Sequence, residues 1–153
     1  MIDFLANHPH HIDTVLDWRY SEWARYFGFP EKRLWREKLV AQCGRETIPS
    51  IFIALEKDEP VGTAALVQND MTVFTELSPW LSGVYVKADR RCQGIGGLLV
   101  ARVEALAREL ACEKLFLFTF DQDAYYAKRG WRETRKDSYV SVPVSIMEKS
   151  LNP

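Results

Sequence analysis

One stretch of the 153-residue chain, residues 84–99, limits the fold more than any other. Val84–Val86 alternates in the way typical of a strand, a basic turn with Gly94 and Gly96 follows, and the spacing of an amphipathic helix then begins. The first amides of a helix have no acceptor within that helix, and they lie at the positive end of its dipole. A strand, a glycine turn and a helix N-terminus in this order predict a binding site for a polyanion such as a pyrophosphate.

Two well-known phosphate-binding motifs do not fit this turn. The dinucleotide fingerprint needs a third glycine where this chain has Leu99, and a P-loop ends in Gly-Lys-Ser/Thr, which does not occur here. An ordinary strand-to-helix turn with surface arginines stays open as the alternative.

The turn resembles motif A of the GNAT superfamily of N-acetyltransferases, Arg/Gln-x-x-Gly-x-Gly/Ala, which Arg91, Gly94 and Gly96 match. A second resemblance follows the next predicted strand. There, residues 125–131, Tyr-Tyr-Ala-Lys-Arg-Gly-Trp, are similar to motif B of the same family. The two motifs stand in the family's order, and the resemblance covers about residues 50–150.

The resemblance implies an α/β (α+β) protein with a GNAT-like acyltransferase fold. Its central sheet should be mixed, mostly antiparallel, with six to seven strands flanked by helices and with a βαβ unit that binds acyl-CoA. We expect a single domain over residues 1–153. The residue patterns predict strands at Met1–Leu5, Ser50–Leu55, Pro60–Val67, Lys114–Phe120, Trp131–Lys136 and Val144–Lys149, a further strand that ends at Val86, and a brief extended segment at Thr72–Phe74. They predict helices over Ile12–Phe27, from Pro30 to Gly44 and from the glycine turn to Leu110, and a short helix with Asp121 as its N-cap.

The resemblance also implies ligands and site residues. The glycine turn should bind the pyrophosphate of acetyl-CoA, and the strand before it should pair with the pantetheine arm. The expected CoA-binding residues are therefore Val84, Tyr85, Val86, Arg91, Cys92, Gln93, Gly94, Ile95, Gly96, Gly97 and Asp121. Tyr126 is expected to protonate the departing thiolate, while Tyr125 should face the core, since neighbouring helical positions point about 100° apart. Glu76 is the candidate for the base that deprotonates the amine, and this assignment is weaker than that of Tyr126 as the acid.

The composition excludes several other classes of function. Lys and Arg total 20 against 21 Asp and Glu, so no global field should attract nucleic acid or an anionic membrane. No apolar run approaches the ~20 residues of a membrane span. The three cysteines form no CxxC pair, which favours a reducing, cytoplasmic location and argues against disulfides or zinc. The cluster His8–His11 is expected to form a turn before a helix and not a metal site.

The expected reaction is direct attack of a primary amine on the thioester of acetyl-CoA within a ternary complex. Acetyl-CoA is the expected acyl donor, no metal is expected, and a homodimer stays open. The acceptor, a small molecule or a peptide N-terminus, is not identified by the sequence. The alternative function is a non-catalytic module that binds and senses acyl-CoA.

Overall fold

The computed structural model describes residues 1–152 and contains a seven-stranded sheet with the strand order β1-β2-β3-β4-β5-β7-β6. The sheet is antiparallel except between β4 and β5, which are parallel. The expected mixed, mostly antiparallel sheet is confirmed. The elements are β1 (Ile2–Phe4), α1 (Ile12–Trp23), α2 (Lys32–Ala41), β2 (Ser50–Glu56), β3 (Glu59–Val67), β4 (Trp80–Val86), α3 (Ile95–Glu109), β5 (Lys114–Thr119), α4 (Asp123–Ala127), β6 (Arg132–Tyr139) and β7 (Val142–Ser150).

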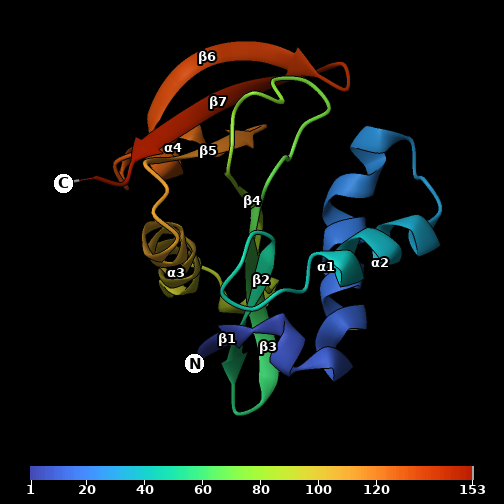
Figure 1. The fold of residues 1–153 in the computed structure, drawn as a ribbon. Coiled ribbons are helices and arrows are strands. Elements are labelled where there is room, and N and C mark those ends of the chain that lie inside the picture. The colour runs from blue at the N-terminus through green and yellow to red at the C-terminus, as the bar shows by residue number, and fades with distance from the viewer. Residues whose placement is uncertain (153) are drawn as a thin grey trace.

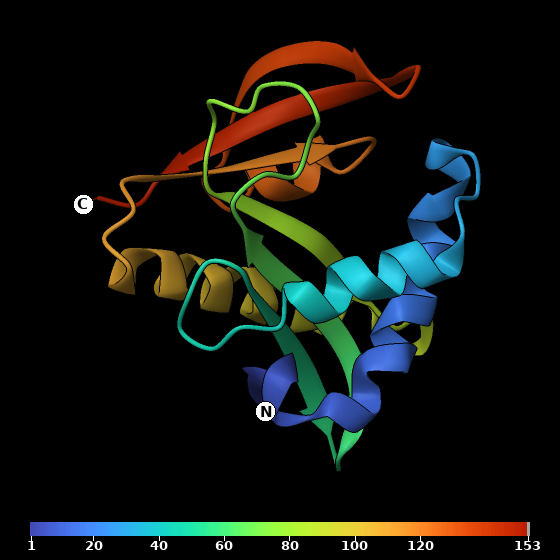
Figure 2. The same cartoon turned by 45° about the vertical axis from the view of Figure 1, so that its right-hand side comes forward.

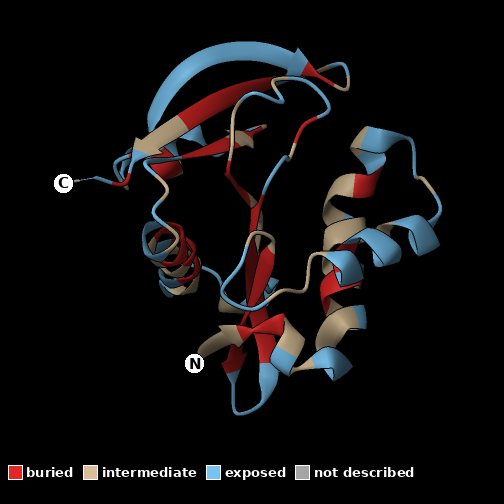
Figure 3. Cartoon of the chain, viewed as in Figure 1, coloured by how far each residue is buried: buried red, intermediate tan, exposed pale blue. Residues whose placement is uncertain are grey.

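Helices cover both faces of the sheet, with α3 on one side and α1 and α2 on the other (Figure 1). The alternation of side chains along β2 explains this arrangement. Phe52 packs in the core beneath α3, whereas Ile51 and Ile53 pack in the core beneath α1 and α2. The central strands are buried on both faces, while β6 is exposed along most of its length (Figure 3).

The strands β4 and β5 diverge, and this opening positions the site. Within residues 1–152 their ladder pairs Trp80 with Phe116, at the start of β4. Beyond that point β5 continues with β7 and β6, and β4 continues with β3 (Figure 2). The edge of β4 that faces β5 is therefore left without a strand partner along its second half.

A bulge interrupts β4 in the same region. Ser82 pairs with Ala65 and Tyr85 pairs with Thr63, so β4 carries one more residue than β3 across this interval. Gly83 accommodates the extra residue with a φ of +60°, a conformation that favours glycine. The bulge changes the direction of the β4 backbone at the point where β4 diverges from β5.

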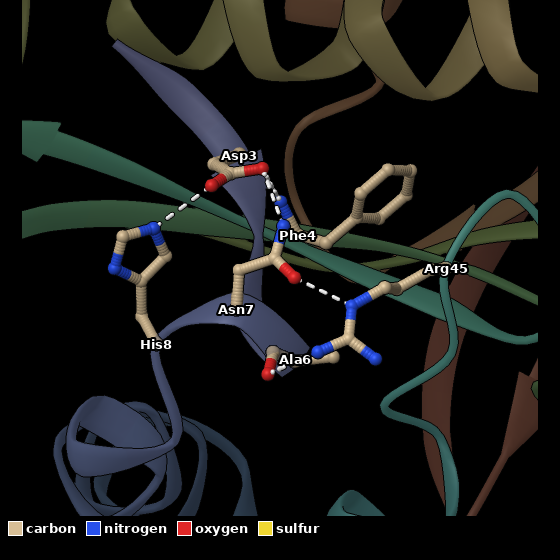
Figure 4. A network of polar contacts seen from close by, with 6 residues as sticks. All are labelled: Asp3, Phe4, Ala6, Asn7, His8 and Arg45. Carbon is tan, nitrogen blue, oxygen red and sulfur yellow. Dashed lines mark hydrogen bonds and ion pairs between the residues drawn. The ribbon is translucent and has the colours of Figure 1, made fainter.

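A polar network ties the N-terminal segment together (Figure 4). Asp3 accepts hydrogen bonds from the amide of Phe4 at 2.8 Å and from the side chain of Asn7 at 3.0 Å, and it pairs with His8 at 2.9 Å. Arg45 reaches this segment from the loop after α2, where Nη2 donates to the carbonyl of Ala6 at 2.9 Å. The histidine cluster lies in the turn that leads into α1, and residues 1–152 hold no group of three or more metal-ligating side chains.

Three local predictions are wrong. Thr72 and Val73 form bends and Phe74 has no regular structure, so Thr72–Phe74 is not an extended segment. The helix expected to reach Phe27 ends at Trp23 and tightens into a 3-10 turn over Ala24–Phe27. Asp121 does not cap α4. The N-cap is Gln122, whose amide donates to the Thr119 hydroxyl at 2.9 Å. Within the described part of the chain, no helix is both long and apolar enough to span a membrane.

Candidate active site

The glycine turn forms an open cradle at the N-terminus of α3. Gly94 is the N-cap, with a left-handed φ of +85°. A Cβ on this residue would meet no atom within 4 Å, so the space above it is free. Because α3 begins at Ile95, the amides of its first turn have no acceptor in the helix and are available to an anion. This geometry fits the pyrophosphate of acetyl-CoA.

The two arginines of the turn are placed differently. Arg91 donates from Nε to the carbonyl of Val86 at 2.9 Å and lies over the Tyr85 ring, so its guanidinium stays on the strand side of the cradle. Arg90 instead forms ion pairs with Glu56 at 3.3 Å and with Asp89 at 3.7 Å. Of the two, Arg91 is therefore the one whose charge is not shared with a carboxylate in the described residues.

Motif B packs directly on motif A. A Cβ on Gly96 would lie 2.8 Å from the hydroxyl oxygen of Tyr125, and a Cβ on Gly97 would lie 3.4 Å from the guanidinium of Arg129. The Arg129 guanidinium in turn stacks 3.7 Å from the centre of the Tyr125 ring. As expected, Tyr125 packs against the core beneath α3, where it is partly buried and its hydroxyl points to the first turn of α3. The more buried ring is Tyr126, which is 8 % exposed.

A cavity of about 700 Å³ passes through the opening between β4 and β5. Neighbouring residues of β5 that face opposite sides of the sheet, Leu117 and Phe118, both line it. Its walls are α1, α2, the loop before β4, the middle of β4, the end of β5, and α4. The side chains that line it include Arg19, Glu22, Trp23, Phe27, Trp35, Lys38, Asp70, Ser82, Phe118, Phe120, Asp121 and Tyr126.

Tyr126 reaches this cavity from α4. Burial raises the pKa of its phenol, and the neighbouring Tyr125 adds to the effect. The hydroxyl therefore stays protonated at neutral pH, and it can donate to a developing anion but cannot act as a base. Its edge-to-face contacts with Tyr125 and Trp131 hold the ring in place.

The carboxylate that lines the cavity is Asp70 and not Glu76. Glu76 is exposed and does not line the cavity, whereas Asp70 from the same loop does. The Oγ of Ser82 donates to Oδ1 of Asp70 at 2.7 Å, which fixes the carboxyl group beside β4. Burial raises the pKa of Asp70 to about 6, against the opposing effects of Ser82, Lys38 and Arg19. Asp70 therefore replaces Glu76 as the candidate base.

Arg19 is the second residue of the cavity that sequence reasoning missed. It projects from α1 against the bulge of β4, where a Cβ on Gly83 would lie 2.9 Å from Nη2. Asp121, expected to bind CoA, is exposed at the rim of the cavity beside Gln122. Its contact with CoA stays a prediction, as do the individual CoA contacts of the cradle residues.

Comparison with known proteins supports the same chemistry. Residues 12–131 match the model of the acetyltransferase (GNAT) family. The chain is 33% identical over 103 residues to the aminoglycoside N(6')-acetyltransferase type 1 of Stenotrophomonas maltophilia, an alignment that covers 62% of this chain and 67% of the relative.

Solved structures share the fold over the whole chain. An aminoglycoside 6'-N-acetyltransferase complexed with coenzyme A superimposes with a TM-score of 0.78 and 18% identity, covering 100% of this chain and 98% of that one. The aminoglycoside 6'-N-acetyltransferase from Enterococcus faecium gives a TM-score of 0.74 at 19% identity, with 100% and 98% covered.

Proposed function

We propose that this chain, which belongs to the acetyltransferase (GNAT) family and is an acetyl-CoA-dependent N-acetyltransferase, acetylates the primary amine of a small molecule held in the cavity between β4 and β5. The observation that carries the proposal is the path of this cavity. It runs through the sheet from the α1–α2 side to Tyr126, beside the half of β4 that has no partner on its β5 side. Its volume of about 700 Å³ suits one small acceptor together with the thioester end of the donor.

On the donor side, the cradle amides bind the pyrophosphate, with Arg91, Cys92, Gln93 and the residues from Gly94 to Gly97 around it. The free edge of β4 at Val84–Val86 pairs with the pantetheine arm in the manner of an added strand. An amide of this edge also polarises the thioester carbonyl. This arrangement places the reacting carbon at the opening of the sheet, next to Ser82 and Gly83.

On the acceptor side, Asp70 receives the amine. An alkylammonium has a pKa of about 10.4 and must lose a proton before its nitrogen can attack. The new C–N bond forms as the C–S bond breaks, the amine proton leaves toward Asp70 or water, and the hydroxyl of Tyr126 donates to the departing thiolate. Both proton-handling groups line the same cavity, as an attack within a ternary complex requires.

The test is a screen of acetyl-CoA consumption, measured as free thiol, with aminoglycosides, polyamines, amino acids and short peptides. The aminoglycosides are included because that curated relative is an aminoglycoside N(6')-acetyltransferase. We expect small amines to increase thiol release and the free thiol to match the acetylated product. If CoA binds but no amine increases thiol release, the chain is a non-catalytic acyl-CoA-binding module and the proposal fails.

A further inference from the structure

The guanidinium of Arg19 lies in a confined position within the acceptor cavity. Its Nη1 donates to Gln42 at 3.3 Å, and its other nitrogens face the bulge of β4. Because Gly83 has no side chain, the guanidinium can lie directly against it. A Cβ on Gly83 would lie 2.9 Å from Nη2 and 3.1 Å from Nε. The bulge and the arginine are thus fitted to each other.

Few hydrogen bonds and no ion pair offset the positive charge of Arg19 within the described residues. Within residues 1–152, its Nε and Nη2 are shielded from solvent and have no hydrogen-bond partner. The carboxylate of Asp70 attracts the charge of Arg19 electrostatically and makes no hydrogen bond to it. A cation that is shielded from water without a paired anion is costly to a fold. Arg19 also lines the cavity, so an anionic group of a ligand can approach the side chain from the cavity and offset its charge.

The position of Asp70 limits the shape of that ligand. Asp70 is bonded to Ser82, and Arg19 lies against Gly83, the next residue of β4. Adjacent Cα atoms are about 3.8 Å apart, so the cation and the carboxylate are anchored side by side on one strand. A ligand that carries an amine and an acid a few bonds apart can satisfy both. A simple amine would leave Arg19 without an anionic partner.

We infer that the acceptor is an α-amino acid, or a molecule with the same arrangement of amine and carboxylate, and that Arg19 binds its carboxylate while Asp70 receives its amine. This inference rests on the proposed function of the cavity. The remaining walls favour an apolar or aromatic side chain on the acceptor, because they present the rings of Trp23, Phe27, Trp35, Phe118 and Phe120.

Matched pairs of acceptors test the inference in the full-length protein. Phenylalanine is compared with phenethylamine, and leucine with 3-methylbutylamine, in acetyl-CoA turnover and in calorimetric binding to the CoA-bound protein. We expect the amino acids to have the higher kcat/KM. Arg19→Gln should raise their KM about 10- to 100-fold, the range for losing hydrogen bonds to a charged group, and should affect the two amines much less. Arg19→Lys should keep part of the preference.

Arg36→Gln is the matched control, since Arg36 lies on the exposed side of α2 and pairs there with Asp13. A wild-type enzyme that uses the amines as well as the amino acids would overturn the inference. So would an Arg19→Gln variant that weakens both series equally, because Arg19 would then only support the bulge. Binding separates the two proposals: acceptors that bind but are never acetylated refute the proposed function, and amino acids that bind no better than their amines refute the role of Arg19.

Discussion

The hydroxyl oxygen of Tyr125 lies 2.8 Å from the position that a Cβ on Gly96 would take. Two segments that are distant in sequence, the cradle and α4, are therefore in contact at a position where only glycine fits without movement. The same α4 carries Tyr126 into the cavity. The contact links the position of the donor's phosphates to the position of the proposed acid.

This contact predicts that the effect of Gly96→Ala on stability changes sign when the hydroxyl of Tyr125 is removed. Gly96→Ala should destabilise the protein, because the new methyl group meets the Tyr125 hydroxyl. In a Tyr125→Phe background the hydroxyl is gone, and the same change should become neutral or stabilising by up to about 1 kcal/mol through helix propensity. Chemical unfolding of the four proteins measures the coupling. Equal effects of Gly96→Ala in both backgrounds would show that the two residues are not in contact.

The cradle predicts a charge-sensitive CoA site. CoA should raise the Tm by mass action, and Gln93→Glu should weaken its binding roughly tenfold by placing a carboxylate beside the pyrophosphate. Gln68→Glu is the matched control, since Gln68 is exposed just beyond the end of β3 that is farthest from the cradle. Thermal shift across a CoA titration measures both. If Gln93→Glu and Gln68→Glu bind CoA alike, the pyrophosphate lies elsewhere.

The cysteines give an independent probe of the same site. Cys92 is exposed in the cradle, whereas burial raises the pKa of the Cys43 and Cys112 thiols. Because the thiolate is the reactive form, an alkylating reagent should label Cys92 first. Saturating CoA should slow that labelling and leave the other two unchanged, as read by peptide mass spectrometry. Labelling of Cys92 at the same rate with and without CoA would contradict its placement at the donor site.

The parts of the fold that follow from local pattern could be predicted from the sequence. The apolar residues Leu99, Val103 and Leu106 are buried as the helical spacing requires. The strands predicted at Ser50–Leu55 and Pro60–Val67 are present as β2 and β3. The order of strand, glycine turn and helix gives the cradle, because this local geometry does not depend on distant residues.

The acceptor side depends on contacts between distant segments, and most of it was not predictable. Asp70 lies in a loop without periodicity, and its carboxyl group is fixed by a hydrogen bond from Ser82, 12 residues away in the sequence. Arg19 did leave a signal: it falls at helical spacing after Val15 and Leu16, so a charge stands on the buried stripe of α1. Which of two adjacent tyrosines faces the cavity depends on how α4 packs on α3, and the 100° rule alone cannot decide it.

Asp70 predicts a pH-dependent rate. If the ionised carboxylate receives the amine, kcat/KM should rise with pH through about 6, the pKa of Asp70. Asp70→Asn should remove this limb of the profile and lower kcat/KM by about 10²–10⁴, the range for a lost general base. Glu76→Gln is the control, because Glu76 is exposed outside the cavity. A variant at Asp70 that keeps the wild-type pH profile would exclude it as the base.

The same carboxyl predicts an effect on stability. The folded pKa of about 6 lies above the ordinary aspartate value of 3.8, so the folded state holds the proton more tightly than the unfolded state. Wild-type stability should therefore fall as the pH rises from about 4 to 6 and level off above that, by up to roughly 3 kcal/mol. Asp70→Asn should lack this loss, which makes it more stable than wild type at pH 7 and similar below pH 4. Tm values across this pH range measure the difference.

Tyr126 predicts a loss of rate without a loss of fold. Tyr126→Phe keeps the ring and its contact with Trp131, so Tm and CoA affinity should stay close to wild type. If the hydroxyl donates to the departing thiolate, kcat should fall by about 10²–10⁴. The fall should shrink with an acyl donor whose thiol is more acidic, because a better leaving group needs less protonation. Tyr125→Phe is the internal control, since the hydroxyl of Tyr125 faces Gly96 and not the cavity. Wild-type turnover by Tyr126→Phe with its best acceptor would assign the proton donor to another residue or to water.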